Sequence, residues 1–321
     1  MRVMSFKNFV ERSGREVRKL LPEDLREFPI EMSVYRKTSG SYTGISLRRK
    51  GEISAAIVNL DLFYDMYRKG VPMKEVLRRM AEVLVMKAPE LDYSWADDYA
   101  RARELLVIRI SRDEDKEELK RECPYRVKED LLFTVHVRFE LPGGKEYGAA
   151  IVNHQLLQEY GITEEQLFAD AMENSMRILP PRLASVYHRK NYENVEEENL
   201  FTHPHPLEGE EQVADVINIT NSWYHEGAPV LFYPGVMERI AECLKGSYII
   251  LLPTVNDGLA FSLALDPELL LKINEFIDIS RTDTPRNEYL SDELYYYDAE
   301  QKQFTSLEKV VEKLKAMRMN A

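Results

Sequence analysis

Three polar side chains at alternate positions of one predicted strand are the first candidates for chemistry. Thr134, His136 and Arg138 alternate with hydrophobic residues in LLFTVHVRFEL, so all three leave one face of that strand, about 7 Å apart. Arg109 lies at a polar position of a second predicted strand, ELLVIRIS. If the two strands share a sheet, Arg109, His136 and Arg138 line one face and can hold an anionic group. The alternative, which the sequence favours, is the ordinary water-facing side of an antiparallel sheet.

Two further groups of residues invite a chemical interpretation. His203 and His205 flank Pro204, and neutral imidazoles are common ligands of transition metals. Because their acidic, proline-rich stretch offers no third ligand at a defined spacing, a solvated loop is favoured over a metal site. Cys123 and Cys243 are the only cysteines. Cys243 falls on the inner side of a predicted amphipathic helix, which favours a buried thiol over a nucleophile.

The common motifs of catalysis and phosphate binding are absent from the sequence. It contains no G-x-x-x-x-G-K-[ST], no G-x-G-x-x-G after a strand, no G-x-S-x-G and no H-E-x-x-H. We therefore expect no cofactor and no metal. Whether the protein is an enzyme stays open, and a protein without catalytic activity is favoured.

The composition excludes several classes of protein. The chain has 321 residues, 44% of them hydrophobic, and a formal net charge of −12, which is typical of a soluble globular protein. The acidic balance argues against a nucleic-acid partner, which needs a basic face. The start of the chain lacks the apolar run of a signal peptide, and no stretch approaches the roughly 18 apolar residues of a membrane span. With no disulfide pattern, these features predict a cytoplasmic protein without a membrane partner.

The elements that must position these residues follow a repeated order. The pentapeptide AAIVN occurs at 55–59 and again at 149–153, each time after a turn-like stretch and before a predicted helix. In the first copy Asn59 is a good N-cap, because its side-chain oxygen can accept a free backbone N–H. No reactive side chain recurs at matching places after the two copies. The repeat therefore predicts scaffold rather than an active site used twice.

A third, degenerate copy of this order follows later in the chain. Strands are predicted at VADVINIT (213–220) and GAPVLFY (227–233), then a helix at 234–246. SYIILLP and GLAFSLAL form a predicted hairpin across Asn-Asp-Gly, and a helix at 266–277 closes the unit. We therefore predict an α+β protein of repeated strand–turn–strand–helix–strand units, with mixed or antiparallel sheets and helices packed on one face.

These patterns also suggest boundaries along the chain. The predicted parts are an N-terminal α+β unit (1–123), a second repeat unit (124–181), an acidic, proline-rich linker or long loop (182–212), a third α+β unit (213–285) and a tyrosine-rich segment with a C-terminal helix (286–321). Within the last part, Tyr295, Tyr296 and Tyr297 precede the helix. Docking of this tail onto the protein's own body is favoured over a partner surface, since chain ends need contacts to be ordered.

Several stretches resemble one known family. TGISLRR, AIVNLDLFYDMYRKGVPMKEVL, TNSWYHEGAPVLFYPGVMERIAECLKGSYIILLP and YLSDELYYYDAEQ are similar to a family of unknown function that is common in clostridial gut bacteria. The resemblance covers nearly the whole chain and implies a shared fold but no activity. One departure is TVNDG after SYIILLP, where the family usually has a Ser-Ser-Ile-His-Glu-like hairpin. The layout is also distantly similar to a second uncharacterised bacterial family and, as a fold, to type III secretion chaperones.

The sequence therefore leaves three functional hypotheses. The favoured one is a cytoplasmic protein-binding or regulatory module without catalytic activity. The rival is a hydrolase or transferase that acts on an anionic substrate, with a dispersed site of Arg109, His136 and Arg138. The third is a structural component of a mobile-element or defence system, which gene neighbourhood would test.

Overall fold

The structure, a computed structural model, describes most of the chain. The described residues are 3–37, 40–49, 55–86, 92–114, 116–141, 147–186, 199–202, 216–264, 273, 277–285 and 288–319. The chain divides into two compact units, the first formed by Met1–Asp92 with Glu140–Tyr147 and the second by Tyr93–Phe139 with Gly148–Ala321. Each unit is described by itself. In the described ranges, no helix has the length and apolar character needed to cross a membrane.

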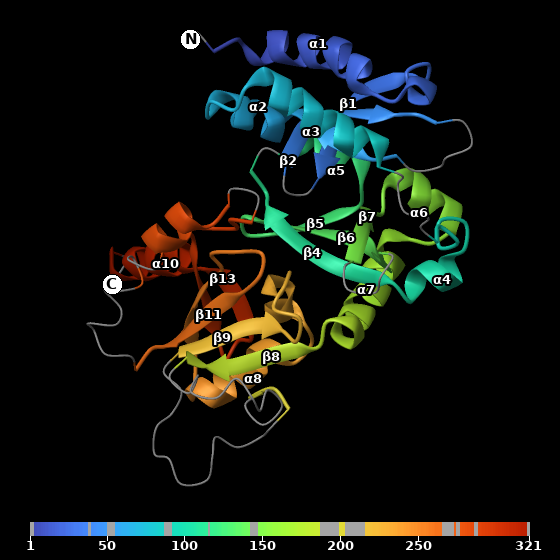
Figure 1. Cartoon of the computed structure of the whole chain (residues 1–321). Coiled ribbons are helices and arrows are strands. Elements are labelled where there is room, and N and C mark those ends of the chain that lie inside the picture. The colour runs from blue at the N-terminus through green and yellow to red at the C-terminus, as the bar shows by residue number, and fades with distance from the viewer. Residues whose placement is uncertain are drawn as a thin grey trace. The chain divides into compact units, whose positions relative to one another are not determined.

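The first unit packs helices on a three-stranded antiparallel sheet. Its elements are α1 (Phe6–Val17), η1 (Arg18–Leu20), η2 (Glu23–Leu25), β1 (Ile30–Lys37), β2 (Gly40–Leu47), β3 (Ile57–Asn59), α2 (Leu60–Arg68) and α3 (Met73–Val85). The strand order is β1-β2-β3. Helices α1, α2 and α3 pack against one another, and α2 and α3 also pack against the sheet (Figure 1). Phe9, Ile45 and Leu60 are fully buried among them.

The first AAIVN corner forms as predicted. Asn59 ends β3, and its side chain accepts hydrogen bonds from the backbone N–H groups of Asp61 and Leu62 at the start of α2. Gly70 follows α2 with a φ of 97°, a conformation that only glycine adopts without strain. Pro72 then precedes α3, where its missing N–H costs nothing. Asn59 at the start and Gly70 after the end thus define both ends of α2.

The second unit holds two antiparallel sheets. Its elements are α4 (Tyr99–Arg103), β4 (Leu106–Arg112), α5 (Glu117–Glu122), β5 (Tyr125–Lys128), β6 (Leu131–Glu140), β7 (Tyr147–Ile151), α6 (His154–Tyr160), α7 (Glu164–Ile178), β8 (Pro181–Ser185), β9 (Val216–Asn221), η4 (Ala228–Phe232), α8 (Val236–Leu244), β10 (Tyr248–Leu251), β11 (Gly258–Ser262), β12 (Leu294–Asp298), β13 (Gln303–Ser306) and α10 (Leu307–Met319). One sheet has the order β4-β6-β5, with β7 also paired to β6, and the other β13-β12-β10-β11-β9-β8. Figure 1 shows β8 and β9 side by side.

The α+β class is confirmed, and the repetition of units stays a prediction. β7 ends within the second AAIVN, and Asn153 caps α6 because its side-chain oxygen accepts a hydrogen bond from the Leu156 backbone N–H. Among the described residues, the third copy differs from expectation, because GAPVLFY forms the 3-10 helix η4 rather than a strand. Pro229 explains the difference, since proline lacks the N–H that a strand ladder needs and suits the first turn of a helix. The helix expected at 266–277 lies largely outside the described residues.

The tyrosine-rich segment docks onto its own body, as predicted. Tyr295 and Tyr297 point into the core from β12 and are fully buried, next to β10. The expected boundaries stay predictions, although residues 182–185 at the start of the expected linker form β8. The second compact unit contains most of the second expected unit, all of the third, and residues 93–123 of the first.

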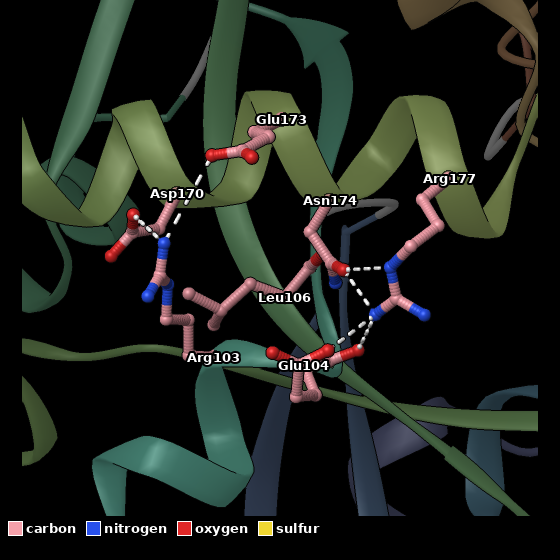
Figure 2. Close-up of polar contacts among 7 residues, drawn as sticks. All are labelled: Arg103, Glu104, Leu106, Asp170, Glu173, Asn174 and Arg177. Carbon is pink, nitrogen blue, oxygen red and sulfur yellow. Dashed lines mark hydrogen bonds and ion pairs between the residues drawn. The ribbon is translucent and has the colours of Figure 1, made fainter.

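Helix α7 covers the outer edge of β4. Ser175 Oγ accepts a hydrogen bond from the Ile108 backbone N–H (2.8 Å), and Asn174 Nδ2 donates to the Leu106 carbonyl (2.8 Å). Buried backbone N–H and C=O groups need hydrogen-bond partners, and no strand of the described chain lies on that side of β4 to provide them. The Ser175 and Asn174 side chains take that place. Arg103 pairs with Asp170 and Glu173 on α7 at one side of these bonds, and Arg177 pairs with Glu104 at the other (Figure 2). Because each of these charges is paired, the cluster joins α7 to β4 and offers no open site.

We predict that Ser175→Ala destabilises the second unit by about 1–3 kcal/mol, because it leaves the Ile108 N–H buried without an acceptor. Equilibrium unfolding in urea measures the loss. Ser280→Ala is the control, since the described residues give the Ser280 side chain no hydrogen bond and we expect a change within about 0.5 kcal/mol. Equal losses in the two variants would contradict the assigned role of Ser175.

Candidate functional site

The structure places the predicted polar residues on one sheet face. Strands β4 and β6 pair antiparallel, with Arg109 opposite Thr134 and Val107 opposite His136. Directly opposed residues project to the same side of an antiparallel pair. The inference that Arg109, His136 and Arg138 share a sheet face is therefore confirmed, whereas their binding of an anion stays a prediction.

This face is not a water-facing side. Thr134 is fully buried and His136 is 4% exposed. Their side chains are hydrogen-bonded to each other, with 3.1 Å between Thr134 Oγ1 and His136 Nε2, and His136 Nδ1 has no partner among the described residues. Burial, with Arg109 close by, holds the pKa of His136 well below its usual range, so the imidazole is neutral. The water-facing alternative is wrong here because both residues pair internally.

Arg109 is already occupied by a carboxylate. Its Nη2 lies 2.7 Å from Glu226 Oε2, and both side chains are mostly buried. Such a pair in a partly dry environment is stronger than a surface pair, since water screens it less. A substrate anion at Arg109 would have to displace Glu226. The pair therefore joins strand β4 to the residues just before η4.

Glu226 belongs to a loop, residues 222–227, that connects β9 to η4. The same loop contacts the second predicted arginine, because the Arg138 guanidinium lies 5.1 Å from the centre of the Trp223 ring. Arg182, on β8, lies 5.3 Å from the centre of the Tyr224 ring. Both distances are within the range of cation–π attraction. Arg109 and Arg138 thus both contact this loop. His136 lies near Arg109, which lowers its pKa, but among the described residues it has no hydrogen bond or ion pair with the loop itself.

Hydrogen bonds hold the 222–227 loop in one conformation. Buried Asn221 accepts from the Trp223 backbone N–H (2.8 Å) and donates to the His225 carbonyl (2.7 Å). Asn256, in the β10–β11 hairpin, accepts from the Glu226 N–H through its side chain (3.0 Å) and from the next N–H, of Gly227, through its carbonyl (3.1 Å). The loop is consequently pre-organised, since few of its backbone groups are free to rearrange.

The loop backbone is also strained. Tyr224 and Glu226 have φ values of 54° and 52°, in the left-handed region that residues with a Cβ rarely adopt. Each such residue costs roughly 1 kcal/mol or more, and strain of this kind clusters at functional sites. Gly227 is needed for a different reason, because a Cβ there would lie 2.4 Å from Thr220 Oγ1 and 2.5 Å from the Asn256 carbonyl oxygen.

The strained loop displays aromatic side chains to solvent. Trp223 is 51% exposed and Tyr224 is 48% exposed. The Trp223 Nε1–H donates to the Ile178 carbonyl at the end of α7 (3.2 Å), which fixes the ring while its apolar surface stays accessible. Large aromatic residues held rigid at a surface are typical of binding sites. The sequence patterns considered above did not predict these residues, although the polar, aromatic turn SWYHEG that ends in glycine is a signal for such a loop.

The hairpin that bonds to the loop contains the segment TVNDG, between β10 and β11. Thr254 Oγ1 donates to Asp257 Oδ1 (2.7 Å), and Asn256 Nδ2 donates to Glu288 Oε2 (3.1 Å). These bonds fix the Asn256 groups that hold the loop backbone. TVNDG therefore supports the loop and contributes no exposed acid–base group of its own.

The remaining candidates from the sequence are two histidines and two cysteines. His203 and His205 lie outside the described residues. The part of the chain that the structure describes has no group of three His, Cys, Asp or Glu side chains able to hold a metal ion. Burial raises the pKa of the Cys123 thiol to about 11 and also raises the pKa of Cys243. Both thiols are free cysteines that stay protonated at neutral pH, which disfavours a nucleophilic role.

Comparisons with known proteins identify a family but no activity. The model of a family of unknown function (DUF5688) matches residues 6–299, which confirms the resemblance to a family without an assigned function. A search of curated proteins found no match, and a search of solved structures found none. The clostridial distribution, the second bacterial family and the likeness to type III secretion chaperones stay predictions.

We predict that Arg109 and Glu226 are energetically coupled. A double-mutant cycle with Arg109→Met and Glu226→Gln should give a coupling of roughly 1–2 kcal/mol in urea unfolding, because each single variant leaves a partly buried group unpaired. The exposed pair of Arg112 and Glu114 is the control, with an expected coupling of about 0–1 kcal/mol. If the two cycles gave equal values, Arg109 would not be the anchor of the loop.

We predict that His136 makes stability depend on pH. Because the pKa of His136 is lower in the folded state, the unfolded chain binds a proton there at a pH at which the folded chain does not. The free energy of unfolding therefore rises with pH, and this contribution is lost as pH falls below about 6.5. The slope from this one group is at most about 1.4 kcal/mol per pH unit. Unfolding in urea between about pH 5 and pH 7 measures it. His136→Gln should flatten the slope, and an unchanged slope would contradict burial of a neutral imidazole.

Proposed function

Since the chain belongs to a family of unknown function (DUF5688), we propose from its own geometry that it is a protein-binding or regulatory module without catalytic activity. The 222–227 loop is its recognition element. The observation that carries this proposal is the combination of a strained, hydrogen-bonded backbone with two exposed aromatic rings. Strained backbone of this kind clusters at functional sites, and partner contact is the role that we assign to it.

The energetics of binding favour such a loop. Trp and Tyr are enriched among the few interface residues whose truncation to alanine costs about 2–4 kcal/mol of binding free energy. Their rings give a large contact area with little side-chain entropy to lose. The bonds from Asn221 and Asn256 order the loop before any partner arrives, which lowers the entropy lost on association.

The rival proposal, an enzyme acting on an anionic substrate, has weaker support. Its three residues share a sheet face, but Arg109 is paired with Glu226 and His136 is buried and neutral. A general base must reach the substrate proton, and a buried imidazole bonded to Thr134 does not. Substitution of Arg109, His136 and Arg138 with loss of a measured activity would revive this rival.

The setting we propose for the module is the cytoplasm. The two free cysteines and the net charge of −12 support a reducing compartment and a protein rather than a nucleic acid as partner. A structural role in a larger assembly is compatible with the same loop, since assembly also requires a contact surface.

We predict that Trp223→Ala and Tyr224→Ala each weaken partner binding with the fold intact. Native pull-downs with the wild-type chain and with each variant measure it, because each truncation removes an exposed ring and should cost roughly tenfold or more in affinity. Tyr125→Ala is the matched control, as Tyr125 is 40% exposed in the same unit but lies outside the loop.

Urea unfolding checks the fold of each variant, with an expected loss below about 1 kcal/mol for either exposed ring. A set of captured proteins that is the same for the wild type, Trp223→Ala and Tyr224→Ala would refute the loop as recognition element.

A further inference from the structure

Strand β1 of the first unit has an edge without a partner in the described chain. It stands at the end of the order β1-β2-β3 and pairs with β2. It is eight residues long, whereas β3 at the opposite edge has three. We propose that β1 pairs antiparallel with β1 of a second copy of the protein, which joins two three-stranded sheets into one. Because the 222–227 loop belongs to the second unit, this interface is independent of the proposed function.

One hydrogen bond at the start of β1 shows which of its backbone groups face the open edge. The Arg48 N–H donates to the Pro29 carbonyl (3.0 Å), and these residues are directly opposed in the register of β1 and β2. Since bonding direction alternates along a strand, the odd-numbered residues of β1 bond to β2 and the even-numbered residues point outward. The outward residues are Ile30, Met32, Val34 and Arg36. Among the described residues, none bonds to the Met32 or Val34 backbone on this side.

The same edge exposes apolar side chains. Met32 is 46% exposed and Val34 is 61% exposed. They project to the helix-covered face, since Met32 lies opposite buried Ile45, but the helices pack mainly against β2 and β3. Unpaired edges are normally protected by lysine, proline or a bulge. Residues 30–34 (IEMSV) contain neither lysine nor proline, and the register with β2 is unbroken. This edge is therefore a template for another strand.

A second copy fits the edge because β1 is complementary to itself about Ser33. With Ser33 opposite Ser33 of the second copy, Met32 opposes Val34 and Ile30 opposes Arg36, so all four outward residues of each copy find partners. A shift of this register by two residues in either direction leaves one outward residue of each copy without a strand partner. A shift by one residue would set outward residues against inward ones. The centred register is thus the one that satisfies the whole edge.

This register also covers the exposed apolar surface. Met32 of each copy lies beside Val34 of the other, once on either side of the two-fold axis, and cross-strand apolar pairs of this kind stabilise sheets. The contact is small for a protein interface, which places it among the weak and reversible ones. We therefore expect a dissociation constant of roughly 1–100 μM.

The charges of β1 allow the pairing. The strand carries one acidic and two basic residues, namely Glu31, Arg36 and Lys37. The strand is therefore not acidic, although the net charge of the chain is −12. In the centred register Glu31 opposes Tyr35 and Arg36 opposes Ile30, so no like charges are directly opposed.

Sedimentation equilibrium of the full chain tests the dimer over roughly 1–200 μM, a range that brackets the expected constant. Val34→Lys should weaken association by about tenfold or more, because it places an ammonium against Met32 of the second copy. Val34→Pro should weaken it similarly, since it removes an outward N–H and leaves every β1–β2 bond intact. Leu62→Lys is the matched control, because Leu62 is 63% exposed on α2 of the same unit, and it should change nothing.

Circular dichroism and urea unfolding check the fold of each variant, and Val34→Lys decides the result if Val34→Pro does not fold. Loss of the dimer in the folded Val34 variants, with the dimer kept in Leu62→Lys, supports the interface. A wild type that stays monomeric over this range, or a dimer that Val34→Lys leaves unchanged, would overturn it.

Disulfide cross-linking tests the register. In the proposed pair the two Ser33 Cα atoms are about 4.5 Å apart, within the range of a disulfide, so Ser33→Cys should form covalent dimers on mild oxidation. The two Glu31 Cα atoms are offset by four residues, about 13 Å, so Glu31→Cys should not. The wild type, with Cys123 and Cys243 as its cysteines, gives the background. Equal cross-linking of both variants, or of neither above this background, would contradict the antiparallel pairing about Ser33.

Discussion

The ion pair between Arg109 and Glu226 is the contact on which the candidate site depends. Arg109 lies on β4, in the sheet that holds His136, and Glu226 lies in the loop between β9 and η4. Because both side chains are mostly removed from water, neither charge is tolerable without the other. Glu226 has a left-handed backbone conformation, and its pairing with Arg109 ties the loop to β4. An arginine on a sheet face thereby acts as an anchor for the 222–227 loop.

The need to pair every buried polar group shapes the rest of the second unit. Thr134 and His136 bond to each other on the buried face, and Ser175 and Asn174 supply partners for the outer edge of β4. Asn221 and Asn256 do the same for the loop backbone. Each arrangement satisfies groups that would otherwise cost about 1–3 kcal/mol when buried. Rigidity of the loop is a consequence, since its amides have fixed acceptors.

Rigidity and exposure together connect this structure to a function. Trp223 and Tyr224 stay accessible on a backbone that is already ordered, and the guanidinium groups of Arg138 and Arg182 lie within cation–π range of their rings. The same features that make the site poor for acid–base catalysis make it suited to recognition: His136 is neutral and enclosed, and Arg109 is neutralised.

Local patterns in the sequence determined much of the fold. The caps at Asn59 and Asn153 and the alternation in LLFTVHVRFEL act within a few residues, so they predicted α2, α6 and β6 and the α+β class. Pro229 overrides the apparent strand of GAPVLFY, because proline lacks the N–H that a strand ladder needs.

Only the tertiary structure decided the burial of His136, the pairing of Arg109 with Glu226 and the stacking on Trp223 and Tyr224. These contacts join residues far apart in the chain, and no local propensity encodes which distant side chain completes a pair.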